Sequence, residues 1–213
     1  MTLKSIPLAA AALLALISVS ACTPIGLVLG AGAGAGLAAY QERGVNGVAR
    51  DLALTSRILD QYARFDHTLI ASIGIEVYES RVLLTGQVET DTERADAVRL
   101  AWKVSGVQDV INEIHITSDG SFLDTARDAW ISTQLEAKIT FDEKVLAINY
   151  AIETVGATVY LIGIAQNAGE LERVKNHARS ISYVRHIVSH VRVKIPTPGA
   201  PTAPALSNPD TPS

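Results

Sequence analysis

The chain has 213 residues, 48% of them hydrophobic and 19% charged, proportions that predict a packed globular core and exclude a wholly disordered or collagen-like protein. Cysteine occurs once, which excludes a disulfide framework and a cysteine-based metal cage within one chain. The formal net charge of −4 does not suit a general nucleic-acid-binding protein.

Residues 1–21 are predicted to be an export signal. One early cation, Lys4, precedes an apolar run of mainly Ala, Leu and Ile over residues 6–19. This run is too short for an ordinary transmembrane helix and has the length of a signal-peptide apolar region.

The signal ends in Val19-Ser20-Ala21-Cys22, which resembles the lipobox of bacterial lipoproteins. The resemblance implies that Cys22 is acylated and becomes the first residue of the mature protein. Thr23 follows in place of the Asp that often retains such lipoproteins at the inner membrane, so the resemblance favours the periplasmic face of the outer membrane. The alternative is an ordinary secretory signal in which Cys22 is incidental.

The flanking segments have biased compositions. Residues 22–48 are rich in Gly alternating with Ala, but lack the strand and βαβ unit that a phosphate-binding glycine loop requires, so we interpret them as a flexible tether. Residues 196–213 hold six of the eight prolines and are predicted to be a solvated, disordered tail with polyproline character.

Between these segments the sequence repeats with an offset of 77 residues. Ala49-Arg50-Asp51 matches Ala126-Arg127-Asp128, and the apolar pattern repeats more closely than the residue identities do. Each copy has a helical apolar pattern, two alternating segments, a second helix and a last strand. The sequence therefore predicts an α+β fold of tandem αββαβ domains over 49–118 and 122–195, each a three-stranded sheet packed by two helices.

The predicted elements can be placed by residue number. In the first helices the core positions are Leu54, Ile58 and Tyr62 in one copy and Ile131, Leu135 and Ile139 in the other. The first two strands of each copy are expected at residues 73–77 and 82–88, and at residues 150–154 and 159–165.

Two motifs of the first copy, Val82-x-Leu84-x-Gly86-x-Val88 and Gly106-Val107-x-x-Val110-x-Asn112-x-Ile114, are similar to the signature of the BON domain. The second copy keeps Gly163 but has Tyr183 and Ser189 in place of the later Gly and Asn. Lipobox, tether and paired domains together resemble the dual-BON outer-membrane lipoproteins associated with division and outer-membrane stress, which bind phospholipid and support envelope integrity. We interpret the strand glycines as structural, because glycine allows close backbone approach.

Comparison of the two copies singles out Trp130 and Phe141, whose counterparts are Ala53 and Arg64. Eleven residues correspond to about three helical turns, so both aromatic side chains are expected on one side of the helix. The polar residues of that surface are Gln134 and Lys138. Aromatic rings beside a cation suit a membrane interface, and the family resemblance implies phospholipid contact at Trp130. The alternative is that Trp130 covers the junction between the domains.

Charge also differs between the copies. Residues 49–120 have 7 basic and 12 acidic residues, whereas residues 122–195 have 9 and 8. The basic residues after Glu172 are candidates for contact with anionic phospholipid: Arg173, Lys175, Arg179, Arg185, Arg192 and Lys194. Alternatively, they form a solvated face or pair with the acidic first copy across a domain interface. Trp102, whose counterpart is Arg179, is a candidate for domain docking or for a protein partner.

No residue pattern predicts catalysis. His186 and His190 are expected about 13 Å apart along one strand, too far for one metal ion. Asp91 and Glu93 lie at a predicted helix start, where capping explains them. We therefore expect a non-enzyme without metal or cofactor.

The leading hypothesis is a lipid-anchored periplasmic protein whose second domain contacts anionic phospholipid and supports outer-membrane integrity. The alternative is a scaffold that docks on an outer-membrane or cell-wall assembly. Expected partners are membrane phospholipid, with outer-membrane assembly or cell-division envelope proteins as further candidates, and no nucleic acid.

Overall fold

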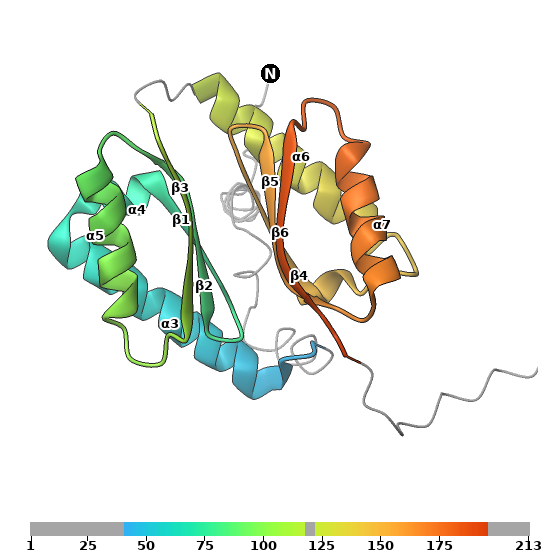
Figure 1. Cartoon of the computed structure of the whole chain (residues 1–213), viewed down its shortest axis with the longest axis horizontal. Coiled ribbons are helices and arrows are strands. Elements are labelled where there is room, and N and C mark those ends of the chain that lie inside the picture. Colours follow the sequence, from blue (N-terminus) through green and yellow to red (C-terminus); the bar gives the residue numbers. More distant parts are fainter. Residues whose placement is uncertain (1–40, 118–121, 196–213) are drawn as a thin grey trace, which may run out of the picture.

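The computed structural model describes residues 41–117 and 122–195, which form two domains of the same architecture (Figure 1). The first contains α3 (Gly44–Phe65), α4 (His67–Ser72), β1 (Ile73–Tyr78), β2 (Arg81–Val88), α5 (Asp91–Trp102) and β3 (Asp109–Ile116). The second contains α6 (Phe122–Thr140), the 3-10 helix η2 (Ala147–Asn149), β4 (Tyr150–Val155), β5 (Thr158–Ala165), α7 (Ala168–Arg179) and β6 (His186–Val193). The predicted α+β fold with tandem αββαβ order is confirmed.

The structure differs from the expected organisation at two places. The short helices α4 and η2 precede the first strand of each sheet and were not predicted. Helix α3 begins at Gly44, so the end of the predicted tether is helical. The predicted signal, the acylation site Cys22 and the proline-rich tail lie outside the described residues. Within the described residues, no helix is both long enough and apolar enough to cross a membrane.

Each sheet has three strands, with the second strand in the centre. The first two strands are antiparallel, and the central strand pairs in parallel with the last one, in the orders β1-β2-β3 and β4-β5-β6. The helices cover the outer face of each sheet, and the inner faces meet in the middle of the molecule (Figure 1). Because side chains alternate along a strand, every strand contributes to a domain core on one face and to the junction on the other.

The two cores lie between helices and sheet, as the apolar spacing predicts. Leu54, Ile58 and Tyr62 of α3 are buried against β1, β2 and α5, and the corresponding residues of α6 are equally buried in the second domain. These helices hold their positions because an apolar stripe at helical spacing is removed from water.

The Asp of the repeated Ala-Arg-Asp tripeptide ties the first helix to the β-hairpin. Asp51 accepts hydrogen bonds from the backbone N–H groups of Glu79 and Ser80, at 2.9 and 2.8 Å. Asp128 accepts the equivalent bonds from Gly156 and Ala157, at 2.7 and 2.8 Å. A buried carboxylate thus pairs with hairpin donors that would otherwise lack partners, which explains why the Asp of this tripeptide is present in both copies.

Gly86 and Gly163 permit a close backbone crossing. Their φ angles are +118° and +148°, and a Cβ atom would lie 2.1 Å from the Ser72 carbonyl oxygen or 2.0 Å from that of Asn149. Only glycine avoids this overlap, so the structural interpretation of these two glycines is supported.

Of the two acidic residues at the start of α5, Glu93 serves as a cap, whereas Asp91 pairs with Arg94. The Thr90 hydroxyl accepts a hydrogen bond from the Glu93 N–H at 3.2 Å, and the Glu93 carboxylate accepts one from the Thr90 N–H at 3.0 Å. This reciprocal pair is a capping box, as expected for this carboxylate.

The domains meet through their sheets. Tyr78 and Leu83 pack against Tyr160 and Ile162 in a buried apolar cluster. The last strands add polar contacts across the junction, with His190 Nε2 2.8 Å from Glu113 Oε1. Trp102 lies on the outer helix α5 and half of its surface is exposed, so the interpretation that it docks the domains is wrong.

The chain that leads into α3 contacts both domains. Arg43 donates to Asp51 at 2.7 Å, and its guanidinium carbon lies 4.4 Å from the Tyr78 ring centre. The Glu42 N–H donates to the Asn149 side chain at 3.0 Å. Residues 42 and 43 are therefore held at the junction and do not belong to a free tether.

Candidate functional site

Trp130 and Phe141 give the outer helix of the second domain an apolar surface. The Trp130 side chain is 43% exposed and that of Phe141 is 86% exposed. The Phe141 N–H donates to the Ala137 carbonyl at 3.1 Å, so helical hydrogen bonding continues one residue beyond Thr140. With this continuation the spacing places both rings on one side of α6. Gln134 is half-buried and Lys138 is exposed in the same stretch.

Trp130 packs within its own domain. Its ring meets the Tyr183 ring edge-on, with ring centres 6.2 Å apart and an angle of 71° between the planes. The Arg127 guanidinium lies 5.3 Å from the Tyr183 ring centre. Since the junction is formed by the sheets, the alternative that Trp130 covers the junction is not what the structure shows.

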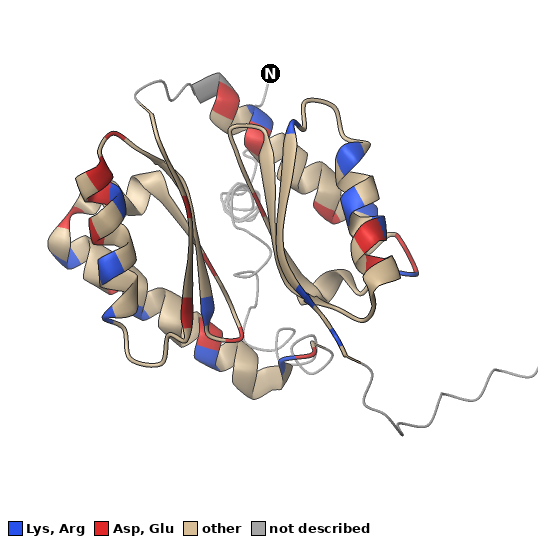
Figure 2. Cartoon of the chain, viewed as in Figure 1, with Lys and Arg blue, Asp and Glu red and all other residues tan. Residues whose placement is uncertain are grey.

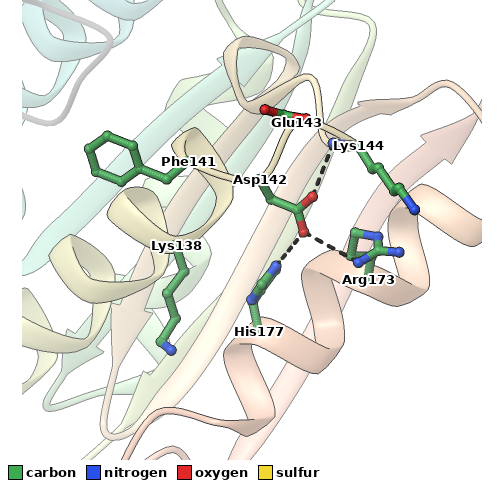
Figure 3. Close-up of a pocket in the computed structure, with 7 residues that line it drawn as sticks. All are labelled: Lys138, Phe141, Asp142, Glu143, Lys144, Arg173 and His177. Atoms are coloured by element: carbon green, nitrogen blue, oxygen red, sulfur yellow. Dashed lines mark hydrogen bonds and ion pairs between the residues drawn. The ribbon is translucent and has the colours of Figure 1, made fainter.

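Phe141 borders an open pocket of about 380 Å³ between the end of α6 and α7 (Figure 3). Its lining residues are Lys138, Phe141, Asp142, Glu143, Lys144, Arg173 and His177. The Phe141 ring points away from the carboxylate of Asp142, whereas Arg173 and His177 point toward it (Figure 3). The pocket therefore combines one projecting aromatic ring with several basic side chains.

Asp142 organises the polar side of this pocket. Its Oδ2 atom lies 2.7 Å from His177 Nε2 and 3.5 Å from Arg173 Nη1, and its Oδ1 accepts the Lys144 N–H at 3.0 Å. The hydrogen bond with His177, followed by the bond from the Lys144 backbone, lowers the pKa of Asp142 below its usual value. Among the described residues, the ammonium groups of Lys138 and Lys144 have no ion-pair partner, so both remain available to an anion.

The predicted basic residues of α7 are already paired along their helix (Figure 2). Glu172 lies 2.7 Å from the Lys175 ammonium group and 2.7 Å from the Arg179 guanidinium. Hydrogen bonds from these two cations lower the pKa of Glu172 to about 2. The carboxylate stays ionised at neutral pH and offsets part of the positive charge there. Arg185, in the loop before β6, is exposed.

Arg192 and Lys194 are placed at the domain junction. Arg192 lies 3.6 Å from Glu79 and Lys194 lies 2.9 Å from Glu42. The hydrogen bond from Lys194 lowers the pKa of Glu42. The contact of Arg192 with Glu79 matches the alternative in which basic residues of the second copy pair with the acidic first copy. Glu42, the partner of Lys194, belongs to the segment predicted as a tether.

The predicted site residues thus fall into separate groups. The outer surface holds Trp130, Gln134, Lys138, Phe141, Lys175 and Arg179, with Arg185 on the adjacent loop, and the junction holds Arg192 and Lys194. Sequence reasoning included Arg173 among the basic residues after Glu172, but it missed Arg127, Lys144, His177 and Tyr183 as members of a site. Tyr183 alone had a usable signal, because a large aromatic stands where the first copy has Gly106.

Within the two described stretches, no group of three or more His, Cys, Asp or Glu side chains is arranged to hold a metal ion.

Comparison with known proteins assigns the fold to a family. The BON domain matches this chain twice, at residues 50–118 and 127–195, which together exceed half of its length. The chain belongs to the BON-domain family. Each BON domain corresponds to one of the two sheets with its helices.

Several relatives match part of this chain in sequence. An uncharacterized protein in the gshII 5′ region of Anaplasma centrale is 40% identical over 131 residues, covering 61% of this chain and 87% of the relative. The osmotically-inducible protein Y of Escherichia coli is 24% identical, and the match covers 68% of this chain and 73% of the length of that protein. The outer membrane lipoprotein DolP of Haemophilus influenzae is 31% identical, and the match covers 52% of this chain and 57% of the length of that protein.

Proposed function

We propose that this protein is a lipid-anchored component of the bacterial envelope whose second BON domain contacts anionic phospholipid. Similarity to an outer membrane lipoprotein supports an envelope-associated role. The lipobox-like Val19-Ser20-Ala21-Cys22 supports attachment through an acylated Cys22, with the two domains on the periplasmic face of the outer membrane. Its role there is binding in support of membrane integrity, without a catalytic step.

The observation that carries the proposal is the projecting Phe141. Its side chain is 86% exposed at the end of α6. A ring of this size in water lacks the stabilisation that burial of its apolar surface would provide. Trp130 is exposed on the same side of the helix. At the headgroup level of a bilayer a Trp ring buries its apolar face and keeps its N–H near water, and a Phe ring inserts as a wholly apolar side chain.

The charges beside these rings suit an anionic surface. Lys138 and Lys144 flank Phe141 at the pocket, whereas Arg173, across the pocket, is already paired with Asp142 (Figure 3). Near an anionic bilayer each such cation contributes about 1 kcal/mol, an attraction that salt screens. Lys175 and Arg179 add less, because Glu172 pairs with both.

An anchor at Cys22 makes even a weak contact effective. The chain from Cys22 to Gln41 spans at most about 65 Å, which sets how far the domains reach from the membrane. A tethered domain meets the bilayer at a high effective concentration, so the second contact orients the domains without supplying the main affinity.

The test is co-sedimentation of the chain from Thr23 to Ser213, which keeps every described residue and lacks the acylation site, with anionic and zwitterionic vesicles. We expect binding to anionic vesicles that weakens at high salt. In the double variant Trp130→Ala/Phe141→Ala, affinity should fall about tenfold or more, because burial of two rings is lost.

A matched control lies on the first domain. Phe65 and Trp102 are each 50% exposed, so Phe65→Ala/Trp102→Ala removes two exposed rings from the other side of the molecule. This control should bind vesicles as the parent protein does. Equal losses in both double variants would show that general hydrophobicity, and not the α6 surface, drives binding.

The alternative function, a scaffold for an envelope assembly, is favoured by that same surface of the first domain. Trp102 and Phe65 remain exposed, and the Arg99 guanidinium lies 5.3 Å from the Phe65 ring centre. Aromatic and arginine side chains are enriched in protein interfaces. Failure of the parent protein to bind either kind of vesicle would favour the scaffold.

A further inference from the structure

Tyr183 occupies a backbone conformation that favours glycine. Its φ angle is +73°, in the left-handed region, where a bulky aromatic side chain is rarely found. The first BON domain has Gly106 at this position, with a φ angle of +104°. The fold therefore accommodates glycine here, and the tyrosine introduces backbone strain into the second domain alone.

Burial does not account for this tyrosine. Its side chain is 65% exposed, and its contacts are with two other surface residues, Trp130 and Arg127. The Trp130 ring stands edge-on to it at 6.2 Å, and the Arg127 guanidinium lies 5.3 Å from its ring centre. Strain that supports no core packing is a feature of binding and active sites.

The first domain lacks this cluster. The counterparts of Arg127, Trp130 and Tyr183 are Arg50, Ala53 and Gly106. Only the basic residue is common to both domains, so the two aromatic rings were added to a fold that is complete without them.

We propose that Tyr183, Trp130 and Arg127 form a binding site for the phosphate and glycerol region of an anionic phospholipid. This inference rests on the function proposed above and extends it to two residues not assigned there. The two rings provide an amphipathic platform at headgroup depth, and the Arg127 guanidinium donates hydrogen bonds to phosphodiester oxygens.

Charge identifies the occupant as an anionic lipid surface. Arg185 lies two residues after Tyr183 and is exposed, which gives the site a second cation. Arg127 forms an ion pair with Asp124 through one nitrogen at 2.8 Å, and its guanidinium makes no other hydrogen bond to the residues that the structure describes, so its other N–H groups can donate to phosphate oxygens. The proposed acyl anchor at Cys22 holds this domain near such a surface.

The decisive variant is Tyr183→Gly, measured for vesicle affinity and for thermal unfolding of the same chain, Thr23 to Ser213. Glycine relieves the left-handed strain, so the melting temperature should stay unchanged or rise, while affinity for anionic vesicles falls about fivefold or more. A residue that serves packing would give the opposite pattern, a lower melting temperature with unchanged binding, and that result would overturn the proposal. Tyr183→Asn, which tolerates the same backbone without the flexibility of glycine, should reproduce the loss of binding.

Ser80→Gly is the matched control. Ser80 also has a positive φ angle, +62°, but lies in the first domain with 1% of its surface exposed. The Ser80→Gly substitution relieves a similar strain away from the proposed site, so binding to anionic vesicles should not change. If the parent protein binds no anionic vesicles, the proposed function fails and this site with it. If the parent protein binds and Tyr183→Gly binds equally well, only this site is refuted.

Discussion

Replacing Gly163 with alanine is expected to lower the free energy of unfolding of the second BON domain by about 4 kcal/mol, one of the largest effects of a single methyl group in this protein. The new Cβ atom would lie 2.0 Å from the Asn149 carbonyl oxygen, and the φ angle of +148° is itself strained for alanine. To relieve this overlap, the chain before β4 must move away from β5, and this movement separates the paired residues Tyr150 and Gly163. Urea denaturation followed by circular dichroism measures the loss.

Gly156→Ala separates the two causes of this effect. Gly156 has a φ angle of +58°, but a Cβ atom there meets only the Gln87 side chain, at 3.6 Å. We expect a loss of about 1 kcal/mol, the cost of the left-handed backbone alone. If both glycine variants lose the same free energy, the close backbone crossing at Asn149 is not the reason that glycine is needed.

The second large effect concerns the pH dependence of the domain junction. Glu76 and Glu153 occupy equivalent positions in β1 and β4. Their neighbours Val77 and Ile152 face the domain cores, so the alternation of side chains along a strand turns both glutamates toward the junction. The Glu153 carboxyl carbon would lie 3.8 Å from a Cβ atom at Gly74, so this side chain reaches across to the first domain. Two half-buried carboxyl groups thus lie where the sheets meet.

Burial raises the pKa of both groups to about 7, from an ordinary value of 4.5. For Glu76 the charge of Glu153 adds to the effect, and Arg43 opposes it. For Glu153 the charges of Asp128 and Glu136 add to the burial. Removal of the carboxylate from water is the main cause at both positions.

The direction of the pH effect follows from proton binding. Between about pH 4.5 and 7 the folded protein holds protons on these two groups that the unfolded chain releases. The free energy of unfolding therefore falls as the pH rises through this window, by about 2–3 kcal/mol per carboxyl group. Above pH 7 both groups are charged in either state and the full cost of burying the charge remains.

The Glu76→Gln/Glu153→Gln variant removes this dependence, because a neutral amide does not ionise. We expect its melting temperature at pH 8 to exceed that of the parent protein by about 5–10 °C, with the two values converging near pH 5. Other ionisable groups are the same in both proteins, so the difference between their melting profiles isolates these two residues. Glu89→Gln, on an exposed side chain, serves as the control and should follow the parent profile. Parallel profiles for the parent and the double variant from pH 5 to 8 would contradict the explanation.

Local features of the sequence predicted the repeated fold because they depend on short-range patterns. The stripe of Leu54, Ile58 and Tyr62 specifies a helix with one buried face, and alternation along residues 82–88 specifies a strand. Glycine in that strand predicted a close approach, although the approaching atom, the Ser72 carbonyl oxygen, became visible only in the structure. Helices α4 and η2 escaped prediction because six and three residues are too few to show a helical period.

The candidate site was predicted only in part. Divergence between the copies identified Trp130 and Phe141 as residues that the fold does not require, and both are exposed. It did not show that Arg192 pairs with Glu79, because those residues lie 113 positions apart in the chain. Likewise, Tyr183 looked like a weakened family motif until its contact with Trp130 gave it a role.

By itself, the sequence determined that the chain contains two αββαβ units, which faces of their helices are buried, and which residues of the second unit are free to differ. The first two properties follow from hydrophobic periodicity within about twenty residues of chain, and the third follows from comparison of the two copies. Only the tertiary structure decided that the two sheets pack against each other, which half-buries Glu76 and Glu153 and leaves the outer helices exposed. The physical reason is that both faces of each sheet carry apolar side chains, and periodicity shows that a face is apolar without showing which surface covers it.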